Sequence, residues 1–184
     1  MANPFRTLKR FVTAGGASGE YVLAENYAVL RKAVFATQPD TLGLIEPADK
    51  NALWGVVMET AYGEAAATLV AMADGAVSLY FSNGGGIIGA GSDPGARQAA
   101  QALLEMAPRF LSACAPATKF PLPEKSHVRF YLLAWGSTQT AEAAEEALAG
   151  NGHALSPLFH QAHEVITAIR LADEGQANHS SESR

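Results

Sequence analysis

The sequence predicts an α+β fold in which helices pack on a single antiparallel β-sheet. Three strand-like runs follow one another between residues 53 and 82 with short connections, and a fourth run with strict alternation lies at His127–Trp135. Parallel neighbours need a crossover of a dozen or more residues, so the short connections predict antiparallel pairing. Helical periodicity on both sides of this meander predicts the covering helices.

The three runs of the meander differ in how they expose their side chains. Leu53–Thr60 is nearly continuous in apolar character, which favours a strand that is covered on both faces. Ala65–Ala73 is the second run, and Asp74-Gly75 after it is typical of a two-residue type I′ hairpin turn. Val77–Ser82 alternates, with one face toward the core (Val77, Leu79, Phe81) and one wetter face (Ser78, Tyr80, Ser82).

Two helices are expected to flank the meander. Apolar residues recur at helical spacing over Glu20–Ala36, and residues 37–51 form a linker. Asp93 and Pro94 are a favourable N-cap and first helical residue for a helix that runs to about Cys114, with a kink at Pro108.

The rest of the chain reads as connector, strand and two helices. Ala115–Lys125 is proline-rich and should be extended. After the fourth strand, Thr140 is expected to cap a short helix over Ala141–Ala149, and Ser156-Pro157 opens a last helix that ends near Asp173. We therefore expect one domain over residues 1–172 and a flexible polar tail over residues 173–184. In outline this order of elements is similar to profilin-like and roadblock-like domains.

Composition restricts the class of protein and its partners. The chain has 184 residues, of which 48% are hydrophobic and only 17% charged, so it can bury a proper core. The net charge of −5 and the lack of a basic cluster argue against nucleic acid as a partner. No apolar run is long enough to cross a membrane. A single cysteine, Cys114, excludes an internal disulfide and fits a reducing cytoplasm.

A glycine-rich segment follows the meander and is the main candidate for a binding site. Gly84, Gly86 and Gly89 match the G-x-G-x-x-G spacing of dinucleotide-binding proteins. That mechanism needs a strand-to-helix turn in a parallel unit, whereas the strand here belongs to a hairpin, so a structural bend is the favoured interpretation. If the segment binds a ligand, the candidate residues are Ser82, Asn83, Gly84, Gly85, Gly86, Gly89 and Ser92.

Three other groups of residues are candidates for chemical sites. His160, His163 and Glu164 have a spacing that can hold a metal, but surface residues without a metal are the favoured interpretation. Cys114 is expected in the core, because no base is placed beside it. Glu59 is expected to face water at a strand end, with a buried and perturbed carboxylate as the alternative.

The functional prediction is a soluble, cytoplasmic, non-catalytic interaction or regulatory module that self-associates, most simply as a homodimer. Low surface charge and a sheet edge that can pair with a second copy favour it. The alternative is a small-molecule or nucleotide-binding protein, and thus possibly an enzyme, that uses residues 84–92. We expect no resident cofactor, and neither nucleic acid nor a membrane as partner.

Overall fold

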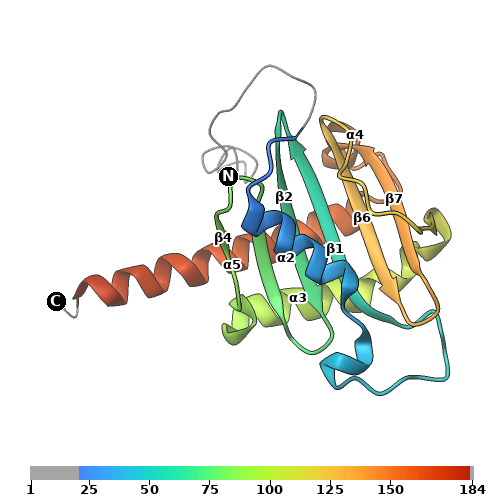
Figure 1. Cartoon of the computed structure of the whole chain (residues 1–184), viewed down its shortest axis with the longest axis horizontal. Coiled ribbons are helices and arrows are strands. Elements are labelled where there is room, and N and C mark those ends of the chain that lie inside the picture. The colour runs from blue at the N-terminus through green and yellow to red at the C-terminus, as the bar shows by residue number, and fades with distance from the viewer. Residues whose placement is uncertain (1–20, 183–184) are drawn as a thin grey trace.

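The computed structural model describes residues 21–182, with side chains as far as Gly175, and it contains one antiparallel sheet (Figure 1). Among these residues the sheet has seven strands in the order β4-β3-β2-β1-β6-β7-β5. The strands are β1 Leu53–Tyr62, β2 Ala65–Met72, β3 Val77–Phe81, β4 Gly86–Ile87, β5 Ala115–Pro116, β6 His127–Ala134 and β7 Thr138–Ala144.

Helices cover both faces of this sheet. The helix α2 (Glu25–Ala36) crosses one face, and α3 (Pro94–Met106) and α5 (Ser156–Glu182) lie against the other (Figure 1). Shorter helices are α4 (Glu145–Ala149) and the 3-10 turns η1 Pro39–Leu42, η2 Ala90–Ser92 and η3 Ala107–Ala113. The α+β class with a single antiparallel sheet is therefore confirmed, while the profilin-like or roadblock-like outline stays an expectation.

The alternation of β6 places its side chains on the two faces as predicted. Val128, Phe130 and Leu132 are fully buried in the core under α3 and α5. Tyr131 and Leu133 belong to the second core under α2. The meander is also confirmed, because β1 pairs with β2 and β2 with β3, both antiparallel.

The face of β3 that was expected to be wetter is buried instead. Ser78, Tyr80 and Ser82 are at most 8% exposed. Helix α2 lies over this face, and the Tyr27 hydroxyl forms a 2.8 Å hydrogen bond with Thr68 Oγ1 in β2. The sheet is thus the middle layer of three, and both of its faces contribute to a core.

The proline-rich connector lies on the same face as α2 and is held there by side chains. Arg31 Nη2 donates to the carbonyl of Phe120 at 2.8 Å. The Tyr131 hydroxyl donates to the carbonyl of Pro121 at 2.6 Å, and Tyr21 donates to that of Pro123 at 2.5 Å. Phe120 also stacks on Phe35 of α2, with ring centroids 4.4 Å apart.

The predicted helix at Ala141–Ala149 was wrong over its first half. Residues Thr138–Ala144 form the strand β7, which pairs antiparallel with β6, and only Glu145–Ala149 is helical. Alanine and glutamate favour helix, but pairing with a neighbouring strand overrides such weak propensities. Thr140, expected as a cap, donates from Oγ1 to the carbonyl of Phe130 at 2.9 Å.

Several element ends also differ from the prediction. Helix α2 begins at Glu25, and the expected start at Glu20 lies outside the described residues. Pro108 does not kink one long helix; the chain changes to the 3-10 turn η3 at Ala107. Helix α5 continues to Glu182, beyond the end expected near Asp173, and the mobility of residues 173–184 stays a prediction.

The turn between β2 and β3 is not the predicted type I′ turn. Such a turn needs positive φ at two successive residues, whereas in residues 73–76 only Gly75 has a positive φ, of 90°. The amide of Gly75 donates to the carbonyl of Met72 at 3.0 Å and closes the turn.

Candidate functional site

The glycine-rich segment forms an edge strand of the sheet. Gly86 and Ile87 make up β4 and pair antiparallel with Tyr80 and Leu79 of β3. A dinucleotide fingerprint acts through a parallel strand that enters a helix, and the strand pairs in the described residues are all antiparallel. The glycines therefore lie in and beside a turn and a short edge strand, and not in a strand-to-helix turn of a parallel unit.

Polar groups of several predicted ligand residues are engaged in hydrogen bonds within the segment or to strand β2. Ser82 Oγ accepts from the amide of Ala66 at 3.0 Å, and Asn83 Oδ1 accepts from that of Gly85 at 3.0 Å. The amide of Gly84 donates to the carbonyl of Phe81 at 2.9 Å. Ser92 Oγ donates to the carbonyl of Gly89 at 3.1 Å, so these groups hold the local backbone.

A hollow of about 290 Å³ lies between this edge strand and helix α5. Three of the seven predicted ligand residues line it, namely Asn83, Gly85 and Gly86. The remaining lining residues are Leu79, Phe81, Ile87, Arg170, Asp173 and Glu174. Ser82 is only 2% exposed, and neither Gly89 nor Ser92 lines the hollow. Ligand binding by the segment stays a prediction.

Helix α5 supplies the charged side of this hollow, which sequence reasoning missed. The helix runs behind the sheet and continues past its β4 edge (Figure 1). Arg170 Nη2 lies 3.4 Å from Glu174 Oε1 along the helix. Helix α3, η3 and strands β5, β6 and β7 lie in the chain between these side chains and the glycine segment, and no local pattern in the sequence links the two.

Two large exposed apolar side chains directly follow lining residues along the chain. Ile88 follows the lining residue Ile87 and is 66% exposed. Leu171 follows the lining residue Arg170 and is 64% exposed. An edge strand with exposed apolar neighbours is a typical place for another chain to pair.

Glu59 is buried, so the expectation that it faces water was wrong. Its side chain is 0% exposed, and Arg31 of α2 contacts it through Nε to Oε1 at 2.6 Å and Nη2 to Oε2 at 2.7 Å. Thr68 Oγ1 donates to Oε1 at 3.0 Å. Burial, with a smaller contribution from the charge of Glu59, raises the pKa of Tyr131 to about 12 and also raises the pKa of Tyr27. This bidentate pair joins α2 to the centre of the sheet.

The three weak metal candidates do not point to a common place. His163 is 5% exposed and packs edge-on against Phe159 with ring centroids 4.4 Å apart, while Glu164 is exposed. Burial, with a smaller contribution from His160, lowers the pKa of His163 to about 4. Within the described part of the chain, no group of three or more His, Cys, Asp or Glu residues could hold a metal ion. The expectation of a surface position was wrong for His163.

Cys114 is half-buried at the end of η3, on the side of the main core. Its Sγ lies 3.3 Å from the carbonyl of Phe110, to which it donates. Burial raises the pKa of the thiol to about 11, which disfavours the reactive thiolate. Both observations agree with the predicted packing role.

None of the helices described here is long and apolar enough to cross a membrane. Comparison with family models, with curated proteins and with solved structures finds no match for this chain.

Proposed function

We propose that the chain is a non-catalytic interaction module that self-associates through the β4 edge of its sheet and the adjoining part of α5. The observation that carries the proposal is the hollow between β4 and α5, together with the exposed apolar side chains of Ile88 and Leu171, which directly follow lining residues in the two elements. A cytoplasmic location and a regulatory role form part of the same proposal. The single thiol of Cys114 supports the location.

The charges at the hollow favour a second copy of the same chain as the partner. A two-fold axis brings the same patch of both subunits together, so a charged patch pairs favourably with its own copy only when it carries both charge signs. Arg170 and the acidic pair Asp173 and Glu174 meet this condition within two turns of one helix. In a two-fold pair, Arg170 of one copy can face the acids of the other.

The backbone at this edge also suits a two-fold partner. Strand β4 pairs with β3 on one side, and in the sheet order it is the terminal strand. Edge strands related by a two-fold axis pair antiparallel, as the strands of this sheet already do. Ile88 and Leu171 would then be removed from water on both copies, which supplies an apolar contribution to association.

A second candidate function uses the same hollow for a small molecule. The observation that favours it is that Asn83, Gly85 and Gly86 line the hollow, as the glycine-rich pattern predicted for a ligand site. The volume of about 290 Å³ lies just below the range of about 300–1,000 Å³ that is usual for ligand pockets. Nucleotides and common metabolites are the ligands to test.

The oligomeric state of matched variants tests the leading proposal. We expect sedimentation or light scattering to show a wild-type dimer at about 100 µM, where association with a Kd near 1 µM is almost complete. Ile88→Asp and Leu171→Asp should give monomers, because each places a charge in the proposed interface. Ile45→Asp is the control: Ile45 is 92% exposed but lies in the linker before β1, so the variant should remain dimeric. A monomeric wild type, or equal behaviour of the three variants, contradicts the proposal.

A thermal-shift screen against nucleotides and metabolites tests the second candidate. A ligand at 100 times its Kd adds about 2.7 kcal/mol to the free energy of unfolding. Binding that is lost in Asn83→Ala while the oligomeric state is unchanged would support it. Gly86→Val is a poor test, because a Cβ there would lie 2.6 Å from the carbonyl oxygen of Leu79 and would disturb the β3–β4 pair itself.

A further inference from the structure

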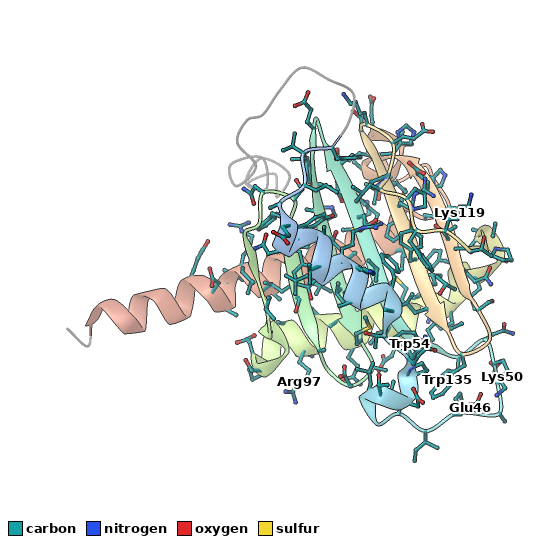
Figure 2. The ribbon with its side chains drawn as sticks, viewed as in Figure 1. Glu46, Lys50, Trp54, Arg97, Lys119 and Trp135 are labelled. Atoms are coloured by element: carbon teal, nitrogen blue, oxygen red, sulfur yellow. The ribbon has the colours of Figure 1, made fainter. Side chains whose placement is uncertain are left out.

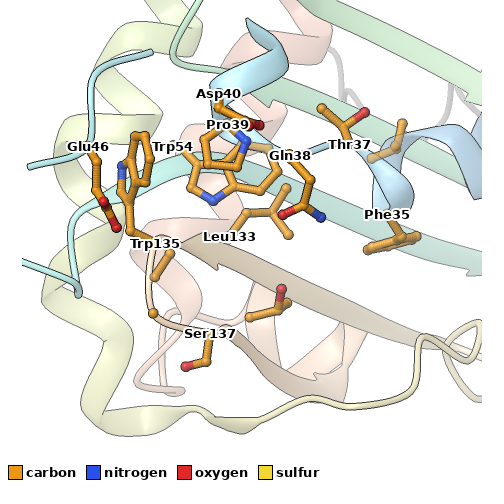
Figure 3. Close-up of a pocket in the computed structure, with 14 residues that line it drawn as sticks. Phe35, Thr37, Gln38, Pro39, Asp40, Glu46, Trp54, Leu133, Trp135 and Ser137 are labelled. Atoms are coloured by element: carbon orange, nitrogen blue, oxygen red, sulfur yellow. The ribbon is translucent and has the colours of Figure 1, made fainter. Parts of the chain in front are cut away.

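A second and larger pocket lies away from β4, where α2 ends beside the start of β1 and the end of β6. Its volume is about 480 Å³. Trp54 of β1 and Trp135 after β6 form part of its wall, together with the chain that leaves α2 (Figure 3). Figure 2 shows the two tryptophans at one end of the sheet, close to Glu46. This pocket takes no part in the function proposed above.

The charges of this pocket favour a cation. Asp40 and Glu46 are the charged residues among those that line it, and both are acidic. Lys50 pairs with Glu46, but both side chains are 56% exposed, so water screens that pair. Asp40 accepts a hydrogen bond from the amide of Thr41 at 2.8 Å and has no basic side chain beside it in the pocket wall.

The end of helix α2 adds to this negative potential. Val34, Phe35 and Thr37, at the C-terminal end of the helix, line the pocket. A helix C-terminus carries a partial negative charge on its last carbonyl groups, and the last turn of α2 contains no basic residue to offset it. The acidic side chains and the helix end therefore both favour a positively charged ligand.

The aromatic side chains can contact an organic cation directly. Trp54 is 7% exposed and forms the inner part of the wall, and Trp135 is half-buried (Figure 3). The face of an indole ring is the best aromatic partner for a positive charge. Phe35 is already engaged, because Arg31 lies 5.0 Å from its ring centroid and Phe120 stacks on it. Trp135 is thus the more accessible of the two indoles, and Trp54 leaves only a small part of its surface open.

We propose that this pocket binds a small organic cation with an alkylammonium head group. Aromatic faces beside carboxylates recognise such cations, because methylated ammonium is weakly hydrated and spreads its charge over apolar surface. A pocket of about 480 Å³ lies within the range for small ligands. The polar side chains of Gln38, Ser137 and Thr138 in the wall offer hydrogen bonds to a hydroxyl or carboxylate elsewhere in the ligand.

The test is a titration of the full chain with choline, in which tryptophan fluorescence and calorimetry measure binding. The chain has only two tryptophans and both line this pocket, so the fluorescence reports on the site without a background. The neutral isostere 3,3-dimethylbutan-1-ol, in which carbon replaces the charged nitrogen, is the matched ligand. We expect saturable binding of choline and binding of the isostere weaker by about tenfold.

Variants identify the groups that recognise the cation. Asp40→Asn and Trp135→Leu should each weaken choline binding by about tenfold, with Trp54 as the remaining reporter in the second variant. Asp40 is exposed, so its variant should fold. Asp49→Asn is the control, because Asp49 is an exposed acid that does not line the pocket, and it should bind as the wild type does.

Three results would overturn the proposal. They are the absence of saturable heat and fluorescence change up to about 50 mM choline, equal binding of choline and its neutral isostere, and an equal effect of Asp40→Asn and Asp49→Asn. Ile88→Asp should bind choline normally, so the outcome does not depend on the dimer proposal.

Discussion

The buried ion pair between Arg31 and Glu59 predicts a large loss of stability in Arg31→Met. Methionine retains an unbranched apolar stem like that of arginine. The substitution removes both guanidinium contacts to the Glu59 carboxylate, whose side chain is 0% exposed. Glu59 then retains one donor, Thr68, at 3.0 Å. The carbonyl of Phe120 in the connector also loses its 2.8 Å contact with Arg31.

The expected magnitude follows from the burial of the pair. Removing one partner of a buried pair costs about 3–5 kcal/mol, because the remaining charge is left without compensation. For a chain of this length, each kcal/mol lowers the Tm by about 2–4 °C. We therefore expect Arg31→Met to unfold roughly 6–20 °C below the wild type, at a pH near 7.

The double variant Arg31→Met/Glu59→Leu separates the charge effect from the loss of packing. It removes the uncompensated carboxylate, and apolar replacements of buried pairs are often neutral or stabilising. We expect the double variant to be clearly more stable than Arg31→Met. The free energy of unfolding of all of these variants can be measured by urea titration, with the fluorescence of the buried Trp54 as the signal. A loss below about 1 kcal/mol in Arg31→Met, or a double variant as unstable as the single one, would refute the reasoning.

Two further predictions concern His163 and Gly91. The pKa of His163 is lowered to about 4 in the folded chain. Between about pH 6.5 and pH 4 the unfolded chain therefore binds more protons than the folded chain. The free energy of unfolding should fall as the pH drops through this window, by at most about 3 kcal/mol. Urea midpoints should show a smaller drop between about pH 7 and pH 4.5 in His163→Leu than in the wild type, and equal drops would contradict this. A Cβ at Gly91 would lie 1.9 Å from the carbonyl oxygen of Gly75, so Gly91→Ala should lose about 1–3 kcal/mol in thermal unfolding. Gly152→Ala, where the added Cβ meets open space, should be near neutral, and an equal loss there would argue against a steric cause.

The strands with strong alternation or continuous apolar character could be predicted from the sequence. In β6 a shift of one residue would exchange its two sets of side chains between the cores, so the pattern determines which residues share a face. The segment Thr138–Ala144 has no such pattern. Its strand state comes from pairing with β6, a long-range contact that local propensity does not contain.

The environment of Glu59 shows both what the sequence contains and what it omits. The continuous apolar run Leu53–Thr60 indicates coverage on both faces, so a carboxylate within it needs a cationic partner. That signal was present. The identity of the partner was not, because Arg31 lies in a separate helix, and only the docking of α2 on the sheet brings Arg31 Nε to 2.6 Å from Glu59 Oε1.

The candidate sites depend still more on tertiary structure. Gly86 and Arg170 line the hollow at β4 from two different elements. Trp54, Trp135 and Asp40 line the pocket at the end of α2 from three different segments. In each case the residues come from elements that are adjacent only after the sheet has formed. Sequence reasoning could therefore find the glycine segment but not its partners in α5.

The way the connector is held has a consequence for slow opening of the protein. Prolines at 121 and 123 have no amide hydrogen, so side chains from elsewhere fix this segment through its carbonyl groups. Because Arg31 contacts both Glu59 and the connector, α2 cannot lift from the sheet without also breaking the contact of Arg31 with the carbonyl of Phe120 in the connector. The amide hydrogens of α2 and of residues 117–125 should exchange with solvent as one cooperative unit, at rates distinct from those of α3 and α5 on the opposite face.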